Sequence, residues 1–175
     1  MNFNLDKSIE LLERTPNIFK ALFYGLSHDW ATINEGKNTW SGYTIIGHLI
    51  HGEKTDWMPR AKIILGENQD KHFEPYDRFA QDKLYANQTI EELLNEFEEL
   101  RKKNLTELRS WSLTTDDLNK KGIHPELGIV TLRELISTWT IHDMAHLNQV
   151  SRVLVKHYSK DVGPWTNYIK ILQES

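Results

Sequence analysis

Two histidines one helical turn apart give this sequence its clearest chemical signal. His142 and His146 lie in the segment Trp139–Gln149, whose apolar spacing predicts a helix. Positions i and i+4 share one helix face, so both imidazoles can bind the same divalent metal ion. They also interrupt an apolar stripe, which places them on the face toward the core. The stripe comprises Leu132, Leu135, Trp139, His142, His146, Val150 and Val153.

A buried imidazole needs partners for both of its nitrogens, and a stacked pair in an apolar stripe costs free energy unless something organises it. A divalent metal would do so. The alternative is that each histidine is a hydrogen-bonded core residue. The pattern is also similar to the zincin signature His-Glu-x-x-His, but Asp143 is shorter than Glu and Arg152 occupies the metzincin position of a third histidine. A protease is therefore not expected.

A third ligand would have to come from another element, and the segment Gly47–Glu53 offers two histidines. At about 100° per residue, His48 falls beside the apolar arc of the predicted helix, whereas His51 falls nearly opposite it. His48 is therefore the better candidate for a metal ligand, and His51 is expected to be exposed.

Three charged residues, Glu53, Asp56 and Arg60, project onto that apolar arc, where an unpaired charge is costly. Asp56 and Arg60 stand at i and i+4 and can form an ion pair. Glu53 or Asp56 could instead lie behind a metal ligand. The sequence assigns no catalytic residue, although Glu53 and Asp143 are the carboxylates that could move a proton at such a site.

Other aromatic and histidine side chains carry weaker signals. His124 lies in a His-Pro-x-x-Gly turn just before the helix of His142, so its position relative to the site is of interest. The remaining histidines are expected at the surface or at helix caps, and the tryptophans are expected to pack in the core or at the bundle ends. These residues are His28, His72 and His157, and Trp40, Trp57, Trp139 and Trp165.

The elements that must position these side chains are predicted to be all α-helical, in one domain spanning residues 1–175. Capping boxes at Thr89–Glu92 and Thr131–Glu134 open two of four long helices. Proline is expected to bend the second helix, and Pro16 makes the first either one kinked helix or two segments. The long helices are expected at 5–26, 41–65, 89–111 and 131–158, with short helices at 76–84 and 165–172, a loop at 67–77 and a turn-rich connection at 121–128.

Composition excludes several classes of function. The 175 residues include no cysteine, so disulfides, thiolate catalysis, Cys-type zinc sites and iron–sulfur clusters are ruled out. The net charge is −4 without a block of like charges, which argues against a nucleic-acid or membrane partner. Asp6, Glu10 and Glu13 do not fit a signal peptide, and no apolar run approaches the length of a membrane span, so a cytoplasmic protein is expected.

Taken together, these motifs resemble the DinB/YfiT-like family over almost the whole chain. The resemblance rests on Trp40-Ser41 and Gly47–Glu53, followed by a capped third helix and the pattern His142-Asp143-x-x-His146-x-x-Gln149. It extends to the stretches 73–81, 124–128 and 162–165.

The resemblance implies a four-helix bundle of up-down-down-up topology, commonly homodimeric, that holds a divalent metal on three histidines. In this chain those positions are His48, His142 and His146. Three nitrogen ligands leave coordination positions open, as in catalytic sites, and suit zinc or nickel without choosing between them.

Active members of the family use the metal to bind and deprotonate a low-molecular-weight thiol. The resemblance therefore implies a metal-dependent, thiol S-transferase-like enzyme acting on small electrophiles, because a metal ion lowers the pKa of a bound thiol or water. A metal-dependent hydrolase, with Glu53 or Asp143 moving the proton, is the alternative enzyme. A third alternative is a non-enzymatic stress or interaction protein whose bundle the metal stabilises.

Overall fold

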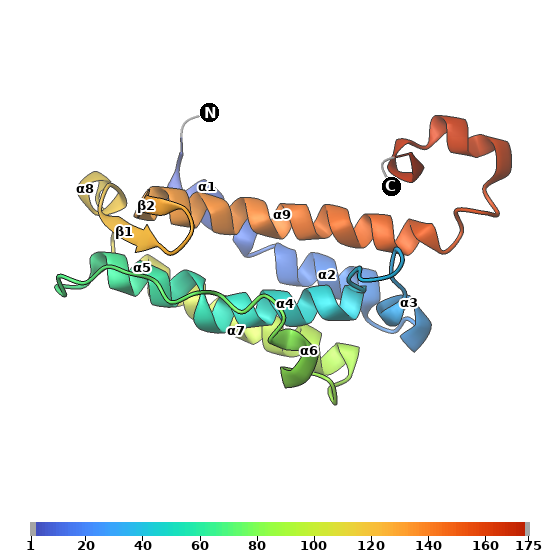
Figure 1. The fold of residues 1–175 in the computed structure, drawn as a ribbon, viewed down its shortest axis with the longest axis horizontal. Coiled ribbons are helices and arrows are strands. Elements are labelled where there is room, and N and C mark those ends of the chain that lie inside the picture. The colour runs from blue at the N-terminus through green and yellow to red at the C-terminus, as the bar shows by residue number, and fades with distance from the viewer. Residues whose placement is uncertain (1–2, 174–175) are drawn as a thin grey trace.

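Four helical rods packed side by side form the body of the molecule (Figure 1). The computed structural model describes residues 3–173. The four rods are α1 with α2, α4 with α5, α7, and α9. The helices are α1 (Leu5–Leu12), α2 (Thr15–Phe23), α3 (His28–Thr32), α4 (Gly42–Thr55), α5 (Trp57–Leu65), α6 (Gln81–Leu84), α7 (Ile90–Ser110), α8 (Thr115–Leu118) and α9 (Leu132–Lys156). The short elements are strands β1 (Lys121–His124) and β2 (Gly128–Thr131), and the 3₁₀ helices η1 (Gly163–Tyr168) and η2 (Lys170–Leu172).

The chain direction along the rods is up, down, down, up (Figure 1). The α4–α5 rod and α7 therefore run parallel, and a long connection, residues 66–89, must return along the outside of the bundle before α7 can begin. The predicted all-α four-helix bundle and its topology are confirmed. No helix among residues 3–173 has both the length and the apolar character needed to cross a membrane.

The first two rods are each interrupted. Pro16 stands at the start of α2, so the first rod consists of two segments rather than one kinked helix. The second rod breaks at Asp56, whose φ and ψ are −111° and −74°, and not at Pro59 itself. Proline disturbs the turn before it because it lacks an N–H and its ring clashes with the carbonyl four residues back. The bend expected from Pro59 therefore appears one turn earlier.

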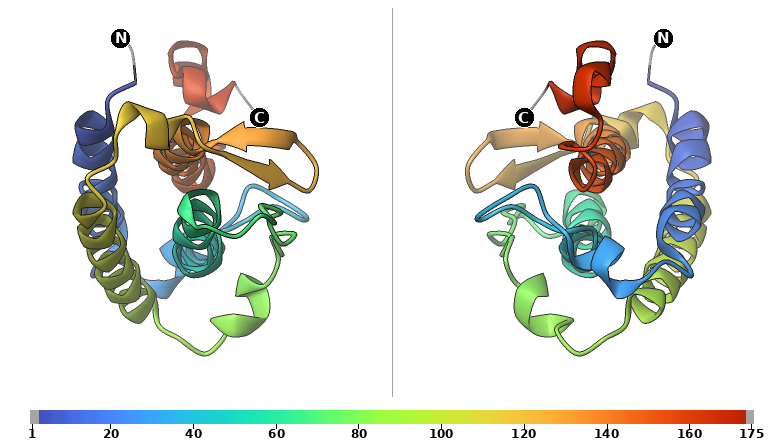
Figure 2. Two further views of the ribbon diagram at one scale, coloured as in Figure 1. Left: turned by 90° about the vertical axis from the view of Figure 1, so that its left-hand side faces the viewer. Right: turned by 90° about the vertical axis from the view of Figure 1, so that its right-hand side faces the viewer.

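A small antiparallel hairpin, β1 and β2, replaces the turn-rich connection expected at 121–128. Gly128, with φ +74°, ends its turn in a conformation that favours glycine. The connection between the second and third rods lies along the hairpin, since the Phe73 N–H donates to the Ile123 carbonyl at 2.9 Å and the Ile123 N–H donates to the Lys71 carbonyl at 2.9 Å. End-on views show the connection and the hairpin on the same side of the bundle (Figure 2).

Other short elements differ from expectation. The helix expected at 76–84 is limited to α6, the closing helix expected at 165–172 consists of η1 and η2, and α3 and α8 were not anticipated. These are elements of three to six residues, too short for hydrophobic periodicity to indicate, although a capping box of Thr114 and Asp117 opens α8. The two long helices opened by capping boxes, α7 and α9, begin where predicted.

Substitution of Thr131 tests the capping box that begins α9, the helix that carries His142 and His146. Its hydroxyl accepts from the Glu134 N–H at 3.2 Å, and the Glu134 carboxylate accepts from the Thr131 N–H at 2.7 Å. We expect Thr131→Ala to lower the free energy of unfolding by about 1 kcal/mol, because a backbone donor loses its acceptor. Thr131→Ser keeps the hydroxyl and should stay within about 0.5 kcal/mol of wild type. Urea denaturation followed by circular dichroism measures both; equal losses in the two variants would contradict the capping role.

Candidate metal centre

Three imidazoles from two helices meet at one point between α4 and α9. The Nε2 atom of His142 lies 3.1 Å from Nε2 of His48 and 3.1 Å from Nε2 of His146. A ligand atom from each residue lies within 4.8 Å of the other two. Helical spacing accounts for the pair on α9, and the packing of α4 against α9 adds His48. The structure thus brings together the three residues that the sequence singled out.

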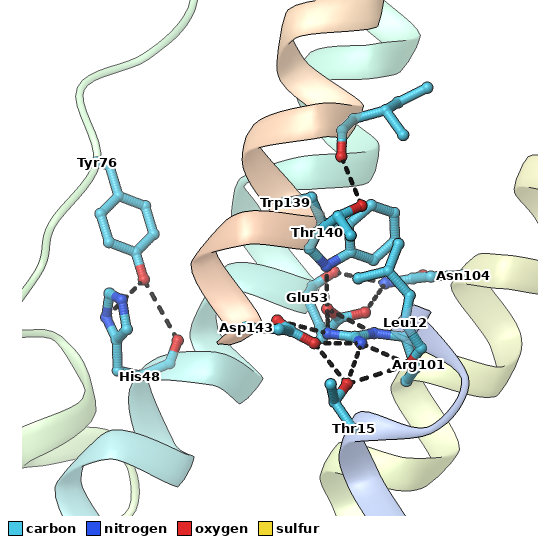
Figure 3. Close-up of polar contacts among 11 residues, drawn as sticks. Leu12, Thr15, His48, Glu53, Tyr76, Arg101, Asn104, Trp139, Thr140 and Asp143 are labelled. Carbon is cyan, nitrogen blue, oxygen red and sulfur yellow. Dashed lines mark hydrogen bonds and ion pairs between the residues drawn. The ribbon is translucent and has the colours of Figure 1, made fainter. Parts of the chain in front are cut away.

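Outer hydrogen bonds orient two of the three rings. The Tyr76 hydroxyl donates to the His48 carbonyl oxygen at 3.4 Å, so it accepts the proton of His48 Nδ1 at 3.2 Å (Figure 3). The Oε1 atom of Gln149 lies 2.9 Å from Nδ1 of His146 and accepts its proton. Each of these bonds leaves Nε2 as a lone pair facing the cluster. Nδ1 of His142 has no partner among the described residues.

Burial keeps the three rings neutral. It lowers the pKa of His48 to about 2, with the nearby His146 and His142 lowering it further. Burial likewise lowers the pKa of His142 to about 4, and that of His146 is also lowered. The Nε2 lone pairs of His48 and His146 both face Nε2 of His142, which can donate at most one proton, whereas a cation between the three nitrogens would bind all of them. Nitrogens about 2 Å from one tetrahedral ion stand roughly 3.3 Å apart, so the cluster fits a divalent metal.

The cluster opens into a cavity of about 620 Å³. One wall is a ridge along α4 and α5, formed by His48, Gly52, Asp56 and Arg60 at intervals of four. The facing wall belongs to α9, and segments of the 66–89 connection and the hairpin complete the lining. A volume of this size is typical of a site for a small organic molecule.

Two tryptophans flank the histidines, although the sequence analysis assigned them to packing alone. The Trp40 ring is stacked on His146, with centroids 6.1 Å apart and an angle of 14°. The Trp57 ring is T-shaped against His142 at 5.1 Å, and it also stacks on Trp139 in the core. Both line the cavity. Tyr76 was missed too, because it reaches His48 from a loop, where no periodic signal points to a contact.

A buried polar layer crosses all four rods beside the histidines, centred on Arg101 of α7 (Figure 3). Its guanidinium donates to Asp143 Oδ2 at 2.6 Å and to Glu53 Oε1 at 2.8 Å. Thr15 of α2 donates to Asp143 at 2.5 Å and accepts from Arg101 at 2.8 Å. Asn104 Nδ2 donates to Glu53 Oε2 at 2.9 Å.

This layer holds the two carboxylates named as proton carriers, Glu53 and Asp143. Burial raises the pKa of Glu53, against the lowering effect of Arg101. The Trp139 indole also donates to Glu53, at 2.9 Å. Neither carboxylate lines the cavity as the structure describes it. Asp143 follows His142 directly on α9, so the layer fixes the backbone from which that ring projects.

The remaining sequence predictions concern His51, the ion pair of Asp56 and Arg60, and His124. His51 was expected to be exposed and is instead 8 % exposed, because Tyr76 covers its ring at 5.0 Å. His51 is outside the three-histidine cluster. The ion pair of Asp56 and Arg60 is confirmed, at 2.6 Å. His124 lines the cavity.

A family model covers most of the chain. The model of the DinB superfamily matches residues 11–150. The chain belongs to the DinB superfamily. In this DinB protein the matched region contains all three clustered histidines.

One solved structure shares the DinB fold. YfiT from Bacillus subtilis is 22 % identical, aligns with a TM-score of 0.73 and covers 85 % of each chain. It is described as "a probable metal-dependent hydrolase with an unusual four-helix bundle topology". No curated protein matches the sequence.

The lowered histidine pKa values predict a pH dependence of stability for the metal-free protein. Between the ordinary pKa of 6.5 and the lowered values, the unfolded chain binds protons that the folded chain does not. The free energy of unfolding should therefore fall as the pH falls below 6.5, by about 2 kcal/mol at pH 5 for each histidine that stays neutral in the fold. Urea denaturation in the presence of a chelator measures this. His142→Gln should show a shallower dependence than wild type, and an unchanged slope would contradict the assignment.

Substitution of Arg101 should cause a large loss of stability. Arg101→Met leaves two buried carboxylates without their cation and should lower the free energy of unfolding by about 3–5 kcal/mol. Arg109→Met is the matched control, because Arg109 lies on the same helix and pairs with Glu13 at the surface. It should cost less than about 1 kcal/mol. Thermal or urea unfolding compares them, and similar losses would show that the layer does not carry the stability.

Proposed function

We propose that this protein is a metal-dependent enzyme whose active site is the three-histidine cluster. The single observation that carries the proposal is the convergence of three histidine Nε2 atoms at one end of a cavity. Such a cluster would be costly as a purely structural feature, since His142 can donate only one Nε2 proton to two buried Nε2 acceptors, those of His48 and His146. The family membership and the fold shared with YfiT support an enzyme of this kind.

A divalent ion held by three imidazoles supplies open coordination positions and lowers the pKa of a thiol or water bound there. The residues of the chain would hold the reactants. Tyr76 and Gln149 fix the ring orientations through Nδ1. Trp40 and Trp57 line the cavity beside the histidines and exclude water from part of it.

The reaction we infer is transfer of a low-molecular-weight thiol to a small electrophile. In this reaction sulfur bonds to the electrophilic carbon, the leaving group takes the electron pair of the broken bond, and the thiol proton goes to solvent. The support is the absence of a carboxylate in contact with the cluster among the described residues, because Glu53 and Asp143 are held by Arg101. Hydrolysis needs a base to move protons during the reaction, whereas a thiol ionises once when it binds.

Hydrolysis is the second candidate, and Asp56 is the residue that favours it. Asp56 lines the same cavity, and burial raises its pKa to about 6 although Arg60 opposes the shift. A pKa in that range suits a general acid or base near neutral pH. The description of YfiT as a hydrolase also supports this candidate.

Metal binding is the first prediction of the proposal. Zinc or nickel should bind at about one ion per chain, measured by elemental mass spectrometry on protein purified without a His-tag. His142→Ala should abolish this binding. His51→Ala is the matched control, since His51 is buried one turn from His48 but outside the cluster, and it should keep the metal. Wild-type protein that takes up neither metal would overturn the metal centre.

Activity measurements distinguish thiol transfer from hydrolysis. Loss of free thiol in the presence of a panel of alkyl halides and epoxides, seen with metal-loaded but not metal-stripped protein, is expected for the transferase. Turnover of ester or amide substrates without added thiol, lost in Asp56→Asn, would instead indicate the hydrolase. A raised melting temperature on metal binding with neither activity would indicate a non-enzymatic bundle and contradict the proposal.

A further inference from the structure

Arg60 stands at the far end of the cavity from the histidines, with part of its guanidinium unused. Its Nε contacts Asp56 Oδ1 at 2.6 Å, and its Nη2 makes a long bond of 3.4 Å to the Glu74 carbonyl. Nη1 has no acceptor among the residues the structure describes. The guanidinium also lies 5.2 Å from the centre of the Phe73 ring. Arg60 is only 7 % exposed, so this donor is held in place rather than free in solvent.

His124 presents a second unused donor beside the same phenylalanine. The backbone N–H groups of Glu126 and Leu127 donate to its Nδ1 at 3.1 and 3.2 Å. A backbone N–H can only donate, so Nδ1 is the acceptor nitrogen and the ring proton is on Nε2. Within residues 3–173, no acceptor faces this Nε2–H. The ring is perpendicular to that of Phe73, at 6.3 Å.

The charged residues near Arg60 and His124 do not occupy the Arg60 Nη1–H or the His124 Nε2–H. Asp56 engages only the Nε side of Arg60. The Glu134 carboxylate, which also lines the cavity, accepts the N–H and hydroxyl of Thr131 in a capping box. Arg78 and Glu126 are exposed cavity residues of opposite charge. Burial and the Arg60 charge lower the pKa of His124, which keeps its ring a neutral donor.

The distance between the two ends of the cavity suggests the length of the ligand. His48 and Arg60 lie 12 residues apart on one ridge, about 18 Å between their Cα atoms at the rise of a helix. Trp57, between them, has an indole N–H without an acceptor in the described part of the chain and a ring that contacts His142. An elongated ligand could therefore meet donors at one end, aromatic surface in the middle and the histidines at the other end.

We propose that Arg60 and His124 form a carboxylate subsite, so that the substrate is a small carboxylic acid whose reactive group lies at the histidines. A carboxylate offers two acceptor oxygens, which matches an Arg60 Nη1–H and a His124 Nε2–H that both lie beside Phe73. The apolar body of the acid would lie against Phe73 and Trp57. This inference rests on the proposed function for its account of the reactive end, but the subsite can bind an acid without any metal.

The test compares phenylacetate with phenylacetamide, which has the same shape and no charge. Binding to chelator-treated protein at pH 7 is followed by NMR titration, with the tryptophan indole signals as reporters. We expect the acid to bind at least about tenfold more tightly than the amide, as hydrogen bonds to a charged acceptor would give.

Two conservative variants locate the subsite. In His124→Asn the side-chain oxygen can still accept the two turn N–H groups, but the Nε2–H is lost. Arg60→Lys keeps the charge beside Asp56 and loses the planar fork. Each should reduce the preference for the acid by about threefold to tenfold. His72→Asn is the matched control, because His72 is exposed and pairs with Asp70 away from the cavity, and it should leave the preference unchanged.

Several results would overturn the carboxylate subsite. Equal binding of acid and amide to wild type would do so, as would an unchanged preference in both His124→Asn and Arg60→Lys. His142→Ala should retain the preference, and its loss there would place the acid at the histidines instead. Zinc is titrated separately into the same variants, so a failure to bind zinc would count against the metal centre and leave the comparison of acid with amide intact.

Discussion

The fold depends on one buried cation, the Arg101 guanidinium. Each of the four rods contributes to the polar layer around it, through Thr15, Glu53, Asp143 and Arg101 itself. A charge of this kind is tolerated in a core only if its partners are in place, so the rods can assemble in one relative position and register. Two clusters of buried apolar side chains lie on either side of the layer, and they contribute the hydrophobic stabilisation that the polar layer does not. The layer therefore determines where α4 and α9 lie along each other.

The histidine cluster depends on this position of α4 relative to α9. A shift of one turn between α4 and α9 would move His48 about 5 Å from the pair on α9 and separate the nitrogens. Glu53 lies five residues after His48, and Asp143 lies beside His142, so the same two helices carry both the layer and the cluster. The carboxylates that seemed from the sequence to be proton carriers act instead, in this geometry, as supports that position the ligand-bearing backbone.

Helical periodicity and capping predicted the long helices and the face of His142 and His146, because both are local properties of the chain. The same local reasoning failed for His51, since the Tyr76 ring that buries it arrives from a loop distant in sequence. The hairpin was missed for a related reason: its strands are four residues long, and part of its pairing is with the 66–89 connection. Tyr76 and Trp40 could not be placed at the site by spacing, although the stretch 73–81 belongs to the family resemblance. What the sequence could not supply was the set of contacts between distant segments, which only the packed fold determines.

The parallel arrangement of α4–α5 and α7 has a consequence for how this architecture can diversify. Two parallel neighbours cannot be joined by a tight turn, so residues 66–89 form a return path, and residues of that path line the cavity. The segment is mostly without regular structure, and it contacts the hairpin through main-chain hydrogen bonds and through the Phe73 ring. Apart from Tyr76, which contacts His48, and the buried Phe73, Gln81 and Tyr85, side chains there can be exchanged without disturbing the Arg101 layer or the histidines. The long helices thus hold the reactive centre, while exposed side chains of a connecting segment form part of the cavity wall, so changes there can alter which ligand is admitted without moving the histidines.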